Sequence, residues 1–415
     1  MTMQNSDNNI NWKLYTAISL IMIAGVTLAA ALTRLWVITA IPIGFLFGFF
    51  LQKGDLCGSS ACSEVLVMRD WRKLFGLWVV IVTAMAGIAA LDLLNLVELN
   101  PKPLIYLNYI IGGVIFGVGT VLAGGCVSGA LYKAGTGNLN SIAALTGIPV
   151  GVMMVEFGPL NFFQKWMKQH IVKMNDGGAV SLPSVLGLPF WLLAVAFGII
   201  TVVAVFIYRS RRKPVHNNLV AADIPFWERV LTRPWKVWAS AVAIGLLMIP
   251  AYLSSDASGR NYPLGVTHGV MQAELLIIDH DFNHIWKAKT ADPVPSEIKQ
   301  ETTSNVQQRA VKPKGKKVVW WLIGLVISLV CGSWVSARMS GKARLLPKPP
   351  GEILIAIIGG FLVGIGAAIG GGCVVGNIMS GWALMSVGTF IFGIVTVLAN
   401  WVTTYFYLMG GQTGK

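Results

Sequence analysis

The chain has 415 residues, of which 55% are hydrophobic and only 12% are charged. Soluble domains carry about 25% charged residues, so this composition excludes an ordinary soluble enzyme, a disordered chain and a fibrous protein. The formal net charge of +14 does not indicate a nucleic-acid partner, because the basic residues form short clusters between apolar stretches, as the flanks of membrane helices do.

Long apolar segments follow one another along the chain. A helix needs about 20 apolar residues to cross a bilayer core of roughly 30 Å. The first candidate is preceded by an Asn- and Asp-rich start without a small-residue cleavage site, so we expect it to be retained in the membrane. The sequence thus predicts an all-α polytopic membrane protein with about ten membrane helices, at 12–32, 36–51, 74–94, 103–123, 139–157, 185–208, 234–253, 317–337, 353–371 and 382–407.

The basic clusters predict the orientation, because Lys and Arg collect on the cytoplasmic side. When the spans are counted alternately, three clusters fall on one side, at 69–73, 209–213 and 338–348. We therefore expect both termini in the cytoplasm and three loops outside, at 94–102, 158–184 and 254–316. A further basic cluster at 309–317 lies on the predicted outer side, in a loop long enough to weaken the rule.

The most informative feature is an internal repeat. Residues 110–129 read IIGGVIFGVGTVLAGGCVSG and residues 357–376 read IIGGFLVGIGAAIGGGCVVG, with 11 of 20 positions identical. By the count of spans the two copies cross the membrane in opposite directions, which predicts an inverted repeat with short broken or re-entrant helices. We expect an extra N-terminal helix at 1–35, a first repeat at 36–208, a cytoplasmic linker at 209–233, a second repeat at 234–407 and a tail at 408–415. The second repeat carries a polar insertion at 288–316.

Each repeat carries a Gly-Gly-Cys motif that predicts a break in a membrane helix. Glycine pairs such as Gly124-Gly125 and Gly371-Gly372 end a helix, and unwound backbone is tolerated at membrane depth only inside protein or beside a cavity. A short helix can begin after Cys126 and after Cys373, so we expect each thiol at a helix N-terminus, which attracts anions.

Other residues near these motifs are candidates for the same site. The segment IGFLFGFFLQKGDLCGSS at 43–60 repeats the order of an apolar helix with small residues, a break and a cysteine, here Cys57. Basic residues near the predicted breaks, namely Lys53, Lys133 and Arg260, can draw an anion towards the site. We interpret Cys331 as a packing residue within its span.

The motifs of this sequence resemble those of a known family. GVGTVLAGGCVSGALYKAGTG at 117–137, GIGAAIGGGCVVGN at 364–377 and FGFFLQKGDLC at 47–57 together resemble the YeeE/YedE sulphur-transport family of bacterial inner-membrane proteins. The resemblance implies inner-membrane uptake of thiosulfate or a related sulphur-containing anion, without enzymatic activity and without a cofactor. The extra N-terminal helix and the polar insertion are departures from the family pattern.

The resemblance also implies roles for particular residues. Cys57, Cys126 and Cys373 would line a central constriction and pass thiosulfate along by S–H···S hydrogen bonds, and Asn377 closes the second motif. A small cytoplasmic TusA-like sulfurtransferase is implied as the partner that consumes the ion. Neutral thiols suit a soft dianion, because conduction needs binding that is weak enough for release.

Alternatives remain open at this level. The chain could be a membrane thiol oxidoreductase that uses Cys57 and Cys62 with the pair Cys126 and Cys373. It could also be a transporter of a selenium compound, or a structural membrane subunit whose glycines serve packing alone. No Cys-x-x-Cys motif and no Cys/His cluster is present in the sequence, so we expect no metal site.

Overall fold

The computed structural model describes residues 12–172, 174, 178–211, 225–278, 282–285, 316–345 and 347–410. Most of the predicted insertion at 288–316, the middle of the linker and the end of the tail lie outside these residues. Within the described part of the chain, ten helical segments are long and apolar enough to cross a membrane. Each overlaps a predicted span, which confirms the all-α polytopic membrane protein.

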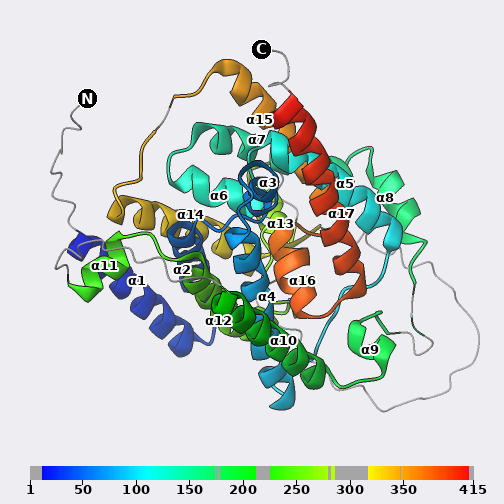
Figure 1. The fold of residues 1–415 in the computed structure, drawn as a ribbon, viewed down its shortest axis with the longest axis horizontal. Helices are drawn as coiled ribbons and strands as arrows, with labels where there is room; N and C mark the ends of the chain where they lie inside the picture. Colours follow the sequence, from blue (N-terminus) through cyan, green and yellow to red (C-terminus); the bar gives the residue numbers. More distant parts are fainter. Residues whose placement is uncertain are drawn as a thin grey trace, which may run out of the picture.

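Eight long helices form two groups of four, and each group takes two helices from each half of the chain (Figure 1). The first bundle contains α5 (Tyr106–Leu122), α7 (Leu139–Glu156), α15 (Pro350–Ile369) and α17 (Val387–Thr404). The second bundle contains α2 (Ala40–Gly54), α4 (Arg72–Leu93), α12 (Val237–Ala257) and α14 (Trp320–Met339). The contacts come in matching pairs, since α7 packs on α15 as α17 packs on α5, and α14 packs on α2 as α4 packs on α12.

The two repeated glycine-rich segments, α5 and α15, pack directly against each other. A methyl group added to Gly112 would lie 2.6 Å from the backbone nitrogen of Gly370, and one added to Gly119 would lie 2.6 Å from that of Val363. Residue numbers rise along one helix as they fall along the other, so the pair is antiparallel. Small residues permit this backbone contact, which we call the glycine seam.

Short helices fill the space between the bundles and contact both of them. Each lies next to a point where a longer helix is interrupted, and none of these short helices crosses the membrane alone. They are α3 (Gly58–Met68), α6 (Val127–Gly135), α13 (Thr267–Ile278), η2 (Val374–Met379) and α16 (Ser380–Ala383). Among these, α13 packs on α7 and α14.

The remaining helices lie at the periphery. Only 6% of the α1 span (Trp12–Thr33) and 17% of the span in α10 (Phe190–Arg211) is buried, against 61% for α4, so α1 and α10 face mainly lipid. The short peripheral elements are η1 (Trp36–Thr39), α8 (Asn161–Lys168), α9 (Leu182–Leu186), α11 (Phe226–Thr232) and η3 (Tyr405–Met409).

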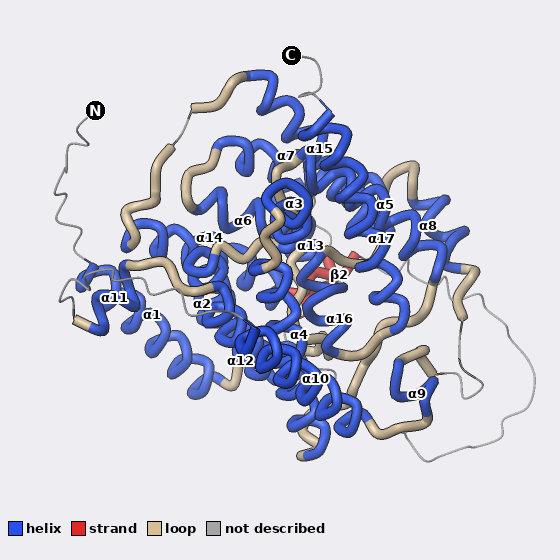
Figure 2. The backbone as a smooth tube through the Cα atoms, viewed as in Figure 1, coloured by secondary structure: helices blue, strands red, loops and turns tan. Residues whose placement is uncertain are grey.

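A small β-element accompanies the helices. Strands β1 (Phe282–Ile285) and β2 (Lys316–Val319) pair in parallel and bring together the two ends of the predicted insertion (Figure 2). The span predicted to begin at residue 317 therefore begins at Trp320. Val318 and Val319 are β-branched and favour a strand, which explains why β2 precedes the helix.

Candidate functional site

The first helix break lies between α5 and α6. Gly124 adopts a left-handed conformation (φ 68°), and Cys126 is the extended residue from which α6 begins. The ammonium of Lys133 donates a hydrogen bond to the Gly124 carbonyl at 2.8 Å. The left-handed residue is thus Gly124 rather than Gly125, and Lys133 contacts the carbonyl group that the break exposes.

The second break, between α15 and η2, repeats the left-handed glycine and the extended cysteine of the first, but Gly372 has a positive φ of 157° that Gly125 lacks. Gly371 has a φ of 67°, and Cys373 is the extended residue from which η2 begins. Here the Lys102 ammonium donates to the Gly371 carbonyl at 2.6 Å and to Asn377 Oδ1 at 2.7 Å. The Asn377 amide donates in turn to the carbonyls of Gly370 and Gly372, both at 2.9 Å. These contacts confirm that each predicted Gly-Gly-Cys motif ends one helix and starts a short one.

Cys57 occupies the same structural position at the break between α2 and α3. It is the extended residue before α3, and its sulfur lies 4.0 Å from the sulfur of Cys126. A side chain on Gly129 would overlap the Cys57 sulfur, so the absence of one makes room for both thiols. We call Cys57, Cys126 and Gly129 the thiol junction.

A packing contact connects the thiol junction to the segment of Cys373, because the Val374 side chain lies against Gly58. A side chain on Gly58, next to Cys57, would overlap Val374, next to Cys373. Cys57, Cys126 and Cys373 are all buried. The three breaks therefore meet in the interior between the two bundles, and no thiol of the three faces lipid.

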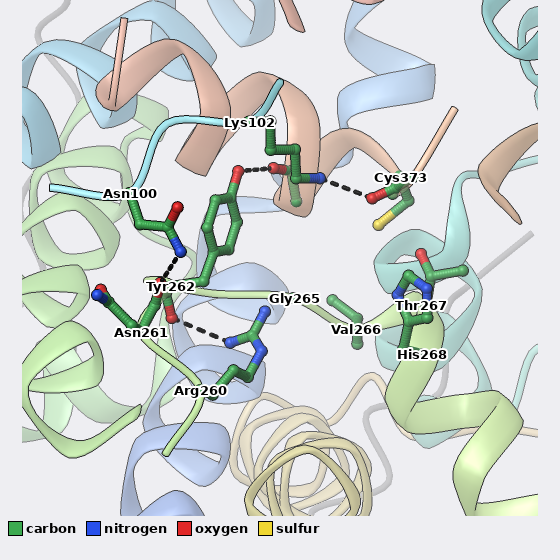
Figure 3. Close-up of a pocket in the computed structure, with 13 residues that line it drawn as sticks. Asn100, Lys102, Arg260, Asn261, Tyr262, Gly265, Val266, Thr267, His268 and Cys373 are labelled. Carbon is green, nitrogen blue, oxygen red and sulfur yellow. Dashed lines mark hydrogen bonds between the residues drawn. The ribbon is translucent and has the colours of Figure 1, made fainter. Parts of the chain in front are cut away.

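Cys373 also lines a cavity of about 270 Å³, which we call the Cys373 cavity. Figure 3 shows its sulfur on one side, with Lys102 coming from one segment of the chain and Arg260 and His268 from another. Among the described residues that line the cavity, none is acidic. The lining residues are Asn100, Lys102, Arg260, Asn261, Tyr262, Gly265, Val266, Thr267, His268, Gly371, Gly372, Cys373 and Gly376.

Two cationic side chains dominate the electrostatics of the Cys373 cavity. Burial, and then the positive charge of Arg260, lower the pKa of the Lys102 ammonium to about 7. Burial lowers the pKa of Arg260 to about 10, so its guanidinium stays charged at neutral pH. Arg260 is held by the Tyr262 carbonyl at 3.0 Å and lies over the rings of Tyr262 and Trp321.

Polar groups without a charge complete the cavity. The Thr267 hydroxyl is buried and has no hydrogen-bond partner within the described residues. Burial lowers the pKa of His268, which lies 4.0 Å from the Glu156 carboxylate outside the cavity lining. Two cations, an unpaired hydroxyl, a thiol and the start of η2 together form a site suited to a small anion with a soft, polarisable atom.

The predicted basic residues have different surroundings. Arg260 lines the Cys373 cavity and Lys133 contacts the first break, whereas Lys53 lies at neither. The Lys53 ammonium instead donates to Ser340 Oγ at 2.7 Å and to the Leu231 carbonyl, which ties α2 to α14 and α11.

Two other cysteines lie apart from the thiol junction. The packing interpretation of Cys331 is wrong, because this residue is exposed on the surface of α14. Cys62 is buried, and its thiol donates to the Gly58 carbonyl within α3.

Lys102, Tyr262, Thr267 and His268 were not among the residues predicted for the site. Lys102 follows a proline just before a span and resembles an ordinary membrane flank, so its sequence context gives no signal. The GRNYPLGVT turn at 259–267 did carry a signal, since it combines Arg260 with a Gly/Pro turn and a short apolar run.

The chain is similar over most of its length to known transport proteins. The chain matches the protein family described as Sulphur transport over residues 53–402. A Spirochaeta thermophila protein named thiosulfate transporter TsuA is 28% identical over 378 residues, covering 88% of this chain and 98% of that protein. The Escherichia coli protein of the same name is 25% identical over 374 residues, covering 89% and 94%. A probable transporter, YedE of Escherichia coli, is 32% identical over 111 residues, covering 24% and 25%. These relatives are named as transporters, not as enzymes.

Proposed function

The chain belongs to the Sulphur transport family, and on this premise we propose that it takes up thiosulfate or a related sulphur-containing anion across a bacterial inner membrane. Two relatives that cover most of its length are named thiosulfate transporters. The observation that carries the proposal is the Cys373 cavity, in which a thiol lies beside two cationic side chains. In the predicted orientation this cavity is the outer entrance.

The cavity chemistry matches the two ends of thiosulfate. The oxygen atoms carry much of the dianion's charge and suit Arg260, Lys102 and the unpaired Thr267 hydroxyl. The terminal sulfur is soft and accepts a weak hydrogen bond from the Cys373 thiol. Sulfate has the same charge but lacks the soft sulfur, so the thiol distinguishes the two ions.

The cations are arranged to release the ion as well as to attract it. Lys102 already donates to Gly371 and Asn377, and Arg260 already donates to the Tyr262 carbonyl. An anion therefore competes with existing hydrogen bonds instead of meeting free charges. This moderates its affinity, which a conducting pathway requires.

From Cys373 we propose that the anion passes to the thiol junction. The 4.0 Å separation of the Cys57 and Cys126 sulfurs supports a shared binding position there, and the contact of Gly58 with Val374 keeps that position next to Cys373. Neutral thiols then accept the ion by S–H···S hydrogen bonds. Lys133, beside the first break, attracts it towards the cytoplasm, where a TusA-like sulfurtransferase would consume it.

We further propose that the segments 36–208 and 234–407 form the inverted repeat. The matching pairs of helix contacts and the antiparallel glycine seam support this arrangement. The thiol junction and Cys373 then lie where the two repeats meet.

The test is uptake of radiolabelled thiosulfate by proteoliposomes that contain the full chain, with and without a proton gradient. Unlabelled thiosulfate is expected to compete, whereas equal concentrations of sulfate, sulfite and selenite compete weakly. If sulfate competes as well as thiosulfate, the thiol makes no distinction and the proposal fails. Strong competition by selenite would instead assign the site to a selenium compound.

The close contact of two sulfurs also favours a second candidate, a membrane thiol oxidoreductase. That function requires a reversible disulfide between Cys57 and Cys126, whose sulfurs are 4.0 Å apart. Mass spectrometry of the purified chain under oxidising and reducing conditions separates the two functions. A transporter keeps both thiols reduced during turnover, whereas an oxidoreductase alternates between the two states.

A further inference from the structure

A second cavity lies away from the transport pathway, between α4 and the peripheral helix α10. Its volume is about 580 Å³, and we call it the interhelix cavity. Trp78 joins the two helices above it, since its indole N–H donates to the Thr201 hydroxyl at 3.0 Å and its ring contacts Phe197. One turn further on, Phe75 lines the cavity from α4, and Ala204 and Val205 line it from α10.

The mouth of this cavity is at the membrane surface. Residues 69–71 connect the spans Trp36–Met68 and Arg72–Leu93, and all three of them, Arg69, Asp70 and Trp71, line the cavity. Trp71 is 58% exposed, as is typical of tryptophan at the level of lipid headgroups. The cavity thus continues from a polar rim into an apolar wall, as a bound lipid requires.

The rim carries positive charge that protein groups only partly offset. Arg69 is exposed and, among the described residues, has no ion pair or hydrogen bond to its side chain. Arg72 pairs with Asp70 at 3.3 Å, but its side chain remains 80% exposed. The Asp70 carboxylate also accepts from the Arg72 backbone N–H at 2.9 Å, which holds the turn in place.

We propose that the interhelix cavity binds an anionic phospholipid. Arg69 and Arg72 bind its phosphate, Trp71 lies at the glycerol level, and an acyl chain lies along Phe75, Ala204 and Val205. Arginine suits phosphate because its planar guanidinium donates two parallel hydrogen bonds. A free phosphate ion would use the rim alone, so the apolar wall favours a lipid. In the predicted orientation this lipid belongs to the cytoplasmic leaflet, where anionic lipids attract basic residues.

The experiment measures lipid binding to the full chain in detergent by native mass spectrometry. The probes are phosphatidylglycerol, phosphatidylcholine with the same acyl chains, and inorganic phosphate. We expect selective retention of phosphatidylglycerol that inorganic phosphate does not displace. If inorganic phosphate displaces the lipid, or if phosphatidylcholine binds equally well, the proposal is overturned.

Two variants separate the rim from the wall. The double variant Arg69→Gln/Arg72→Gln is expected to weaken phosphatidylglycerol binding roughly 30-fold, since each basic residue near an anionic lipid contributes about fivefold. Ala204→Phe fills the wall and is expected to remove selective binding although both arginines remain.

The matched control is Arg229→Gln/Arg233→Gln, which removes the same charge from exposed positions of α11 and its end, away from the cavity lining. Equal loss in this control would show that the effect is only one of net charge. Full retention of selective binding by Ala204→Phe would show that no acyl chain occupies the cavity. Either result contradicts the proposal.

Discussion

The break before Cys126 and the break before Cys373 share a left-handed first glycine and an extended cysteine. They differ at the second glycine, where Gly372 has a positive φ of 157° and Gly125 does not, and in their surroundings. Gly124 and Gly371 have φ values of 68° and 67°, and each of their carbonyls accepts from a lysine ammonium. Cys126, however, contacts the thiol of Cys57, whereas Cys373 lines a cavity with two cations. The comparison indicates that one repeated turn can place a thiol against another thiol or beside a cationic cavity, depending on the elements that pack around it.

The largest expected effect tests whether both breaks are needed for transport. Cys126→Ala and Cys373→Ala are each expected to abolish thiosulfate uptake by proteoliposomes, because the anion has to pass both thiols. Cys331→Ala is the control, since this cysteine is exposed on α14. Normal uptake by either of the first two variants, at equal protein content, would remove that thiol from the pathway.

A second prediction concerns the hydrogen bonds that Asn377 makes at the second break. Asn377 is buried and hydrogen-bonded to Gly370, Gly372 and Lys102, whereas the equivalent residue of the first repeat is Ala130. Asn377→Ala is expected to lower the free energy of unfolding by about 2–3 kcal/mol, because it leaves buried carbonyls without donors.

Thermal unfolding in detergent measures this cost. Asn377→Asp keeps an acceptor for Lys102 but loses the donors to the two carbonyls, and so identifies which bonds matter. An unchanged unfolding temperature in Asn377→Ala would mean that the second break, like the first, is stable without these side-chain hydrogen bonds.

A third prediction tests whether the left-handed glycines of the two turns are equivalent. An added Cβ at Gly124 or at Gly371 would meet nothing within 4 Å, so alanine adds only the strain of a left-handed residue. Each substitution is expected to cost about 1–2 kcal/mol of stability. Gly25→Ala in α1 is the control, because its Cβ would also meet nothing within 4 Å and its φ is not positive. Clearly unequal costs at Gly124 and Gly371 would contradict the equivalence.

The smallest effect concerns the charge at the entrance. Because the pKa of Lys102 is about 7, its ammonium is largely present at pH 6 and largely lost at pH 8. Thiosulfate affinity is therefore expected to fall roughly tenfold over this range, as the binding-competent fraction falls. Arg260 keeps its charge throughout, and His268 faces the same cavity.

The variant Lys102→Arg keeps a positive charge at both pH values and is expected to flatten this dependence. The measurement is thiosulfate affinity by equilibrium binding at each pH. A tenfold fall that persists in Lys102→Arg would assign the pH dependence to another group, such as His268.

The same two breaks show which features of the site the sequence predicts and which it does not. Glycine pairs before Cys126 and Cys373 predicted the breaks, because where a helix ends depends on the residues at that point. The partner of the second break could not be predicted in this way. Lys102 reaches the Gly371 carbonyl across 269 positions of sequence, through a loop whose path depends on how the bundles pack. Lys53 stood close to Cys57 in sequence, yet its buried ammonium ties three helices together instead.

The glycine seam also limits how this sequence can diverge over evolutionary time. A side chain at Gly112 or Gly119 would press on the backbone of α15, and one at Gly359 or Gly366 would press on α5. A mutation on one side can be accommodated only if the opposite helix retreats, which would also displace the cysteine turn attached to it. The two halves are therefore expected to accept changes only in concert, and a half exchanged with that of a distant relative would fit poorly.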